Sequence, residues 1–143
     1  MKWQEKAMFN RWLSVNRLIN MYTEKTRQLN FVLLEDIPFE ELISKLEKAF
    51  NIYLPYKDIK GRYIAKAKLQ EFDIEVVDRI DQLGDFLCDD YHVMYITVDS
   101  DKYFNFEFEN KITSILKDGK IEWRYATWSK LEESEHWRRI YPN

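Results

Sequence analysis

The segment from Tyr91 to Val98 constrains the fold of this chain more than any other. Its residues (Tyr-His-Val-Met-Tyr-Ile-Thr-Val) are mostly β-branched or aromatic, and such side chains favour β-strands. Both faces of the segment are largely apolar, so other parts of the chain must cover both sides of it. The segment therefore predicts a strand that is buried in the protein core.

Further strands are expected on both sides of this segment. Alternating or β-branched runs between turn residues predict them over residues 63–69, 72–77, 103–109 and 121–128. In the run over 103–109, aromatic and polar residues alternate. Because successive side chains of a strand point to opposite faces, we expect Phe104, Phe106 and Phe108 to be buried together. They should pack beside Ile96 and Val98 of a neighbouring antiparallel strand.

Apolar residues at helical spacing predict a long N-terminal helix and two or three shorter helices. The long helix is a basic amphipathic pattern over residues 3–28. Pro38, followed by Glu40 and Glu41, suits the first turn of a second helix, which we expect over residues 38–50. Shorter helices are expected over residues 78–87 and 130–139.

Two connecting segments complete the expected architecture. Residues 51–62 contain turn residues and are expected to form a loop. Residues 111–117 suit either a helical turn that ends at Gly119 or a hairpin arm with its turn at Asp118-Gly119, and we favour the helix. The expected fold class is α+β, with an antiparallel sheet of four to six strands packed with these helices. A single domain over residues 1–143 is expected.

Cysteine usage and hydropathy indicate a cytoplasmic protein. The single cysteine, Cys88, excludes an internal disulfide and is expected to be a buried apolar residue in a reducing compartment. The N-terminus begins with charged residues rather than an apolar signal segment, and no stretch approaches 18 apolar residues. No membrane partner is therefore expected, and the oligomeric state is left open.

Acidic residues are concentrated in one stretch of the chain. Residues 71–109 contain twelve acidic and two basic side chains, a net charge of −10, whereas residues 1–70 carry +5 and residues 111–143 carry +2. Such a block attracts basic partners and speeds their approach. The residues expected to contact a basic protein partner are carboxylates and tyrosines near strand ends and turns: Asp85, Asp89, Asp90, Tyr91, Asp99, Asp101, Tyr103, Glu107 and Glu109.

The sequence contains no strong enzyme motif. Zinc-ligand spacing, a glycine-rich phosphate loop and a nucleophile elbow are all absent, so we expect no catalytic residue, metal or cofactor. His92 lies on a mostly apolar strand and is expected to be a hydrogen-bonded core residue. Glu109-Asn110-Lys111 matches the Glu-x-Lys element of metal-dependent nucleases, with Asp99 or Asp101 as a further ligand. The charge of −10 opposes this alternative, because it repels the phosphate backbone.

Aromatic and basic residues interleave near the C-terminus. Trp123, Tyr125 and Tyr141 alternate with arginines, a pattern that can stack on single-stranded nucleic acid. A core strand followed by a capping helix is the preferred interpretation, because the net charge of this stretch is only +2. No nucleic-acid partner is therefore expected.

The chain resembles the immunity proteins of bacterial toxin–immunity systems, such as contact-dependent growth inhibition. The resemblance rests on small size, acidic and aromatic-rich composition, and the order of a helix over 80–88, a strand over 91–98 and a strand over 103–109. It implies a cytosolic α+β protein that catalyses no reaction. Such a protein binds a basic toxin domain, often a nuclease, and blocks its active site or an adjoining surface. A structural or regulatory adaptor domain is the alternative that composition leaves open.

Overall fold

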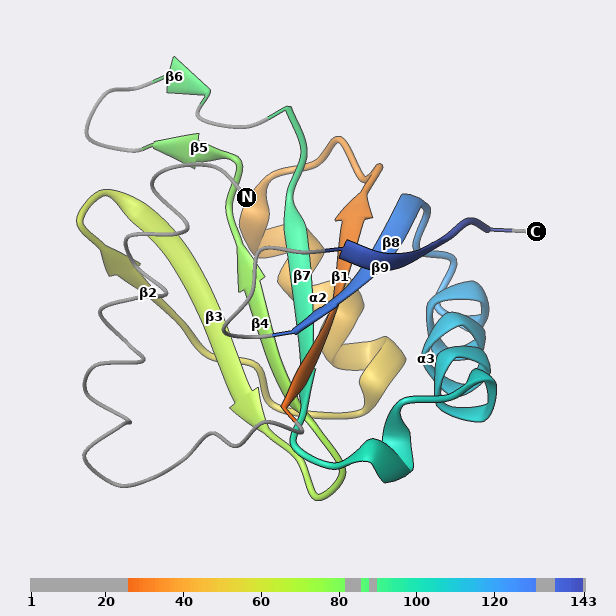
Figure 1. Cartoon of the computed structure of the whole chain (residues 1–143). Coiled ribbons are helices and arrows are strands. Elements are labelled where there is room, and N and C mark those ends of the chain that lie inside the picture. The colour runs from red at the N-terminus through yellow and green to blue at the C-terminus, as the bar shows by residue number, and fades with distance from the viewer. Residues whose placement is uncertain (1–25, 82–85, 88–89, 131–135, 143) are drawn as a thin grey trace, which may run out of the picture.

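The computed structural model describes residues 26–81, 86–87, 90–130 and 136–142. Within them, one antiparallel sheet of seven strands forms the main layer (Figure 1). Its strands are β1 (Arg27–Leu33), β2 (Tyr56–Ile59), β3 (Arg62–Lys68), β4 (Asp73–Val77), β7 (Val93–Val98), β8 (Trp123–Lys130) and β9 (His136–Ile140). Their order across the sheet is β2-β3-β4-β7-β1-β8-β9, so β7 lies at the centre, and β2 and β9 form the edges.

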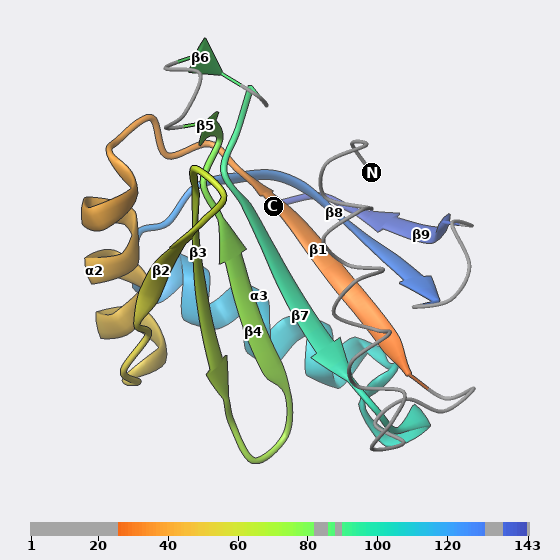
Figure 2. The same ribbon diagram turned by 90° about the vertical axis from the view of Figure 1, so that its left-hand side faces the viewer.

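Two α-helices lie against one face of this sheet (Figure 2). They are α2 (Phe39–Phe50) and α3 (Phe106–Asp118), and a short 3-10 helix, η1 (Asp101–Tyr103), precedes α3. A separate two-stranded sheet consists of β5 (Ile80–Asp81) and β6 (Phe86–Leu87). Among the described residues, neither α-helix has the length and apolar character needed to cross a membrane.

The helix expected over residues 38–50 is confirmed as α2. Pro38 directly precedes it, where a missing backbone N–H is harmless because the first N–H groups of a helix have no helical partner. Glu40 and Glu41 lie in its first turn, next to the positive end of the helix dipole. Asn51 ends the helix in the left-handed conformation, with a φ of 55°.

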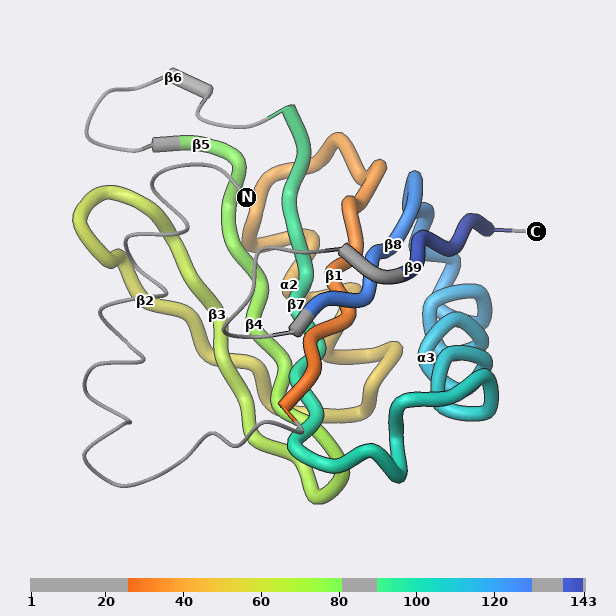
Figure 3. The backbone as a smooth tube through the Cα atoms, viewed as in Figure 1, coloured from red at the N-terminus to blue at the C-terminus, as the bar shows by residue number. Residues whose placement is uncertain are grey.

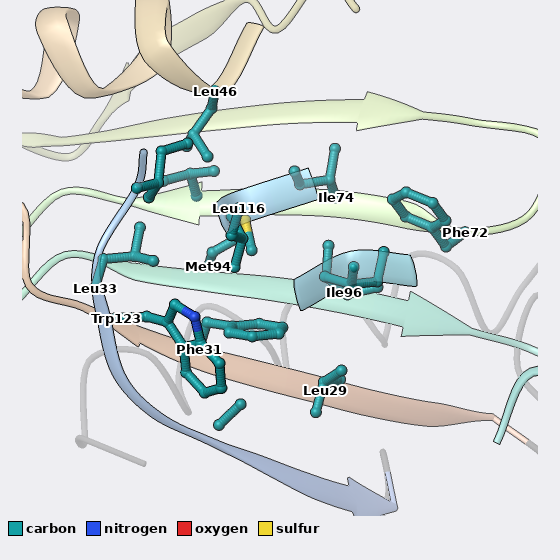
Figure 4. Packing of buried hydrophobic residues seen from close by; sticks show 14 of the residues in the cluster. Leu29, Phe31, Leu33, Leu46, Phe72, Ile74, Met94, Ile96, Leu116 and Trp123 are labelled. Carbon is teal, nitrogen blue, oxygen red and sulfur yellow. The ribbon is translucent and has the colours of Figure 1, made fainter. Parts of the chain in front are cut away.

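The main hydrophobic core lies between the sheet and the two helices (Figure 4). Leu29, Phe31 and Leu33 alternate along β1 and are fully buried on this side. Met94 and Ile96 of β7 are fully buried beside them. The buried strand expected at this place in the chain is therefore confirmed.

The opposite face of the sheet is also shielded around β7. Tyr95 points to this side, is 6% exposed and packs with Ile64 of β3 and Val77 of β4. The face of β7 toward the helices is thus fully buried, whereas on the other face Tyr95 is buried and Val93 and Thr97 are half-buried. The strands expected over residues 63–69, 72–77 and 121–128 are confirmed as β3, β4 and β8, and the helix favoured over residues 111–117 is confirmed as part of α3.

The strand expected over residues 103–109 is wrong, because η1 and the first turn of α3 occupy this segment. Asn105 caps α3, and its Oδ1 accepts a hydrogen bond from the backbone N–H of Phe108 at 2.8 Å. Two residues apart on a helix, side chains point to nearly opposite sides. Phe108 is therefore 4% exposed while Phe106 is 63% exposed, and the three phenylalanines are not buried together. β7 pairs instead with β1 and β4.

Other parts of the expected architecture are also corrected. The sheet has seven strands rather than four to six, since β2 forms within the loop expected over 51–62 and β9 forms where a helix was expected over 130–139. The helix expected over 78–87 is contradicted by β5 and β6. There the Asp78 carboxylate accepts a hydrogen bond from the Ile80 N–H at 3.2 Å, and strand pairing keeps the chain extended. These contacts override the apolar spacing that suggested a helix.

The long N-terminal helix expected over residues 3–28 is not among the helices of the described residues. Residues 3–25 of that range lie outside them. The end of the range is wrong, because Arg27 begins β1. Cys88, which was expected to be buried, also lies outside the described residues.

Candidate partner-binding site

The residues expected to contact a partner do not form one surface. Asp90 and Tyr91 come just before β7, whereas Asp99, Asp101 and Tyr103 come just after it (Figure 3). A strand of this length spans about 20 Å, so β7 holds the two groups apart. Two of the expected residues, Asp85 and Asp89, lie outside the described part of the chain.

The group after β7 lies in one continuous stretch of the chain, which we call the acidic–aromatic corner. The stretch follows β7, runs through η1 and ends in the first turn of α3 (Figure 3). Phe106 and Phe104 are 63% and 37% exposed, and the carboxylates around them are exposed too. The corner consists of Asp99, Asp101, Tyr103, Phe104, Phe106 and Glu107.

Contacts with buried residues hold this corner in place. The Phe104 ring packs edge-on against the ring of Trp128, with 4.9 Å between centroids. Arg27 of β1 forms an ion pair with Asp101 at 3.2 Å and lies 5.5 Å from the centre of the Phe104 ring. A surface that is already ordered loses less conformational entropy when it binds a partner. The corner is therefore suited to binding without rearrangement.

Sequence reasoning missed Phe104 and Phe106 as surface residues, because the alternating pattern was interpreted as a strand. A signal for the helix was present in the sequence. Asn105 is a strong helix-capping residue, and Glu107 and Glu109 follow it in the first turn, where acidic residues favour a helix start.

Glu109 is not part of the corner surface, although it was expected to contact a partner. Its side chain is buried at 5% exposure. One carboxylate oxygen accepts a hydrogen bond from Trp128 Nε1 at 2.6 Å, and the other forms an ion pair with Arg138 at 3.2 Å. Glu109 therefore connects α3 to β8 and β9 inside the protein.

These contacts also weigh against the nuclease alternative. A metal at Glu109 would have to displace Trp128 and Arg138 from its carboxylate oxygens. Lys111 is paired with Glu71 at 2.5 Å and lies on a helix rather than on a strand. In the described segments, no group of three or more His, Cys, Asp or Glu side chains is placed to hold a metal.

A hollow of about 190 Å³ adjoins the corner at the turn between β3 and β4. Asp73, Thr97 and Asp99 line one side of it. Burial raises the pKa of Asp73, and the nearby Asp99 carboxylate raises it further, while Lys68 opposes the shift. The hollow is thus lined by the carboxylates of Asp73 and Asp99 together with the ammonium group of Lys68.

At the other end of β7, His92 is a hydrogen-bonded core residue, as expected. It is fully buried, and its Nε2–H donates to the carbonyl oxygen of Ile37 at 2.9 Å. Its Nδ1 accepts from the Arg79 N–H at 3.2 Å and lies 3.4 Å from the Asp78 carboxylate. This arrangement requires the neutral ring. Arg79 also pairs with Asp36, so His92 joins the end of β4 to the loop before α2.

His92 should make the protein less stable as the pH falls below about 6.5. Burial lowers the pKa of His92 in the folded protein, although its hydrogen bond to Ile37 and the Asp78 carboxylate oppose the shift. Between that lowered pKa and 6.5 the unfolded chain binds more protons, so the free energy of unfolding rises with pH in this window. The slope can reach about 1.4 kcal/mol per pH unit. Urea unfolding from pH 5 to 7.5 should show this slope for the wild type and a smaller one for His92→Gln. Parallel curves would show that His92 does not titrate on unfolding.

Comparison of the chain with protein-family models, curated proteins and solved structures found no match. Its function is therefore inferred from the geometry of its own residues.

Proposed function

We propose that this chain is a cytoplasmic immunity protein that binds and neutralises a basic toxin domain, and that it docks through the acidic–aromatic corner. The observation that best supports the proposal is the combination found there. Phe106 is 63% exposed at the start of α3, and the carboxylates of Asp99, Asp101 and Glu107 are exposed in the same stretch of chain. The corner thus offers an exposed aromatic side chain near three carboxylates, with the guanidinium of Arg138 4.0 Å from the centre of the Phe106 ring and Arg27 paired with Asp101.

Each part of this combination has a physical role in binding. An aromatic side chain that fills a pocket on the partner supplies affinity, and such anchors dominate the energetics of many interfaces. Exposed carboxylates supply attraction over a longer range and orient a basic partner during its approach. If the toxin is a nuclease, these carboxylates contact the basic residues of the toxin that otherwise bind the phosphates of nucleic acid.

The first test of the proposal uses the reading frame next to this gene. The toxin domain encoded there is expressed in a bacterial host with and without this chain, and growth is measured. The proposal expects arrest of growth by the toxin alone and rescue by co-expression of this chain. In a parallel experiment, the charged corner residues of this chain are exchanged for neutral ones. If this variant rescues growth as well as the wild type does, the proposed docking site is wrong.

The second test measures binding kinetics of the purified pair at low and physiological salt. Asp99→Asn/Asp101→Asn should slow association several-fold at low salt, because exposed charges act over about 8–10 Å at physiological salt and further when salt is lower. Phe106→Ala should mainly speed dissociation, by about tenfold or more. Asp118→Asn/Glu122→Gln is the matched control, since it removes two exposed charges, one in the last residue of α3 and one just after the helix. Equal kinetics for all three variants would place the interface elsewhere.

A further inference from the structure

A second exposed cluster lies on β8 and β9, which form one edge of the sheet (Figure 2). The guanidinium of Arg139 lies 4.2 Å from the centre of the Tyr125 ring. Arg124 lies 5.8 Å from the same ring and 5.7 Å from the ring of Tyr91. The ring of Tyr141 lies 6.5 Å from that of Tyr125 and is 62% exposed. We call these five residues the arginine–tyrosine cluster.

Strand pairing places the cluster on the face of the sheet away from the helices. Arg139 pairs across the strands with Thr127, two residues from Tyr125, so Arg139 and Tyr125 point to the same side. Arg138 points to the other side, where it contacts Glu109 of α3. Val32 of β1 pairs with Val93 at the start of β7 and with Tyr125 of β8. Tyr91, which comes just before β7, is therefore close to the rest of the cluster and contacts Arg124.

The two arginines of the cluster differ from three other arginines of the described residues in their ion pairing. Arg27, Arg79 and Arg138 each form an ion pair with a carboxylate. Across residues 26–81, 90–130 and 138–142, no carboxylate lies within ion-pair distance of Arg124 or Arg139, and both are exposed. A guanidinium stacked on an aromatic ring keeps its N–H groups available for a two-point contact with a carboxylate or phosphate.

We propose that the arginine–tyrosine cluster binds a carboxylate-rich, extended segment of a protein partner. Arginine and tyrosine are the residues enriched at the energetic centres of protein interfaces. β9 is the last strand in the order of the sheet, and an extended segment is the form that can lie along such an edge. The carboxylates of the segment neutralise Arg124 and Arg139. This surface is separate from the acidic–aromatic corner and opposite to it in charge, so the inference does not depend on the proposed toxin.

A protein segment fits the cluster better than single-stranded nucleic acid does. Bases need open aromatic faces, whereas a face of the Tyr125 ring is already covered by Arg139. A nucleic-acid strand also carries charge far beyond the cluster, and this chain has a net charge of −3, with −10 in residues 71–109. A short acidic segment makes the same contact with the arginines and meets less of that repulsion.

Nuclear magnetic resonance of the full-length, ¹⁵N-labelled protein tests the inference. The probe is a hexaglutamate peptide with acetylated and amidated ends, titrated at low salt. The side-chain Nε–H signals of Arg124 and Arg139 should shift and saturate, whereas that of Arg138 should not. Arg124→Gln/Arg139→Gln should weaken binding at least tenfold. Lys48→Gln/Lys117→Gln, which removes the same charge from exposed positions on α2 and α3, should bind as the wild type does.

Two further measurements separate this site from a simple charge effect and from nucleic-acid binding. Arg124→Lys/Arg139→Lys keeps both charges but loses the flat guanidinium, and it should bind the peptide several-fold more weakly. Binding at wild-type strength would overturn recognition by stacked guanidinium groups. A twelve-residue oligothymidylate that binds more tightly than the peptide, at the same two arginines, would overturn the protein-segment assignment. Absence of any shift with the peptide would overturn the site altogether.

Discussion

Phe31→Ala should lower the free energy of unfolding by about 3–5 kcal/mol, the range for removing a buried aromatic ring from a core. Phe31 lies on β1 near the middle of the sheet, is fully buried and packs edge-on against Trp123 with 5.0 Å between ring centroids. Its removal leaves a cavity between the sheet and the helices that neighbouring strands cannot close without losing their pairing. Denaturant unfolding followed by circular dichroism measures the change.

Tyr53→Ala is the matched control for this prediction. It removes an aromatic ring of similar size, but Tyr53 is 79% exposed, so the change in unfolding free energy should stay within about 0.5 kcal/mol. Similar losses for the two variants would mean that Phe31 is not enclosed as the structure describes. The denaturant dependence of unfolding should be the same for both variants and the wild type, which would show that the folded core remains compact.

Glu109→Ala should lower the free energy of unfolding by about 3 kcal/mol. The substitution removes the acceptor of the Trp128 Nε1–H hydrogen bond and the partner of Arg138. The indole N–H is then left without its partner inside the core, which is the main source of the expected loss. Glu109→Gln keeps an acceptor oxygen for the indole and should lose less stability than Glu109→Ala.

Glu107→Ala is the control for Glu109, because both residues lie in the first turn of α3 and both interact with the helix dipole. Glu107 is exposed, so its loss should change stability by about 0.5 kcal/mol or less. Combining Glu109→Ala with Trp128→Phe should give less than the sum of the two single effects, because they remove the same hydrogen bond. Equal losses for Glu107→Ala and Glu109→Ala would contradict the structural role of the Glu109 carboxylate.

The two charged surfaces were only partly visible in the sequence. The acidic block of residues 71–109 includes Asp99 and Asp101, which the structure places on the surface at the corner. In the structure, acidic residues of this block lie at both ends of β7. The sequence could not show this separation, because it depends on where the strand begins and ends in the fold. Arg124 and Arg139 are fifteen positions apart, and only the pairing of β8 with β9 brings both to one tyrosine.

Local patterns in the sequence determined the elements that depend on local interactions. The buried strand β7 follows from a run of apolar, β-branched residues, and α2 follows from Pro38, its acidic first turn and its apolar stripe. In these segments the strand or helix preference agrees with the burial that the fold imposes.

Only the tertiary structure decided the segments whose local pattern suits more than one conformation. Residues 103–109 alternate like a strand and also contain the capping residue Asn105, and the contact between Glu109 and Trp128 of β8 favours the helix. Residues 78–87 have helical spacing, but the contacts of Asp78 and Arg79 with His92 and the pairing of β5 with β6 keep them extended. Burial is a property of the whole fold, so the sequence alone could not show that Phe106 faces water and Glu109 faces the core.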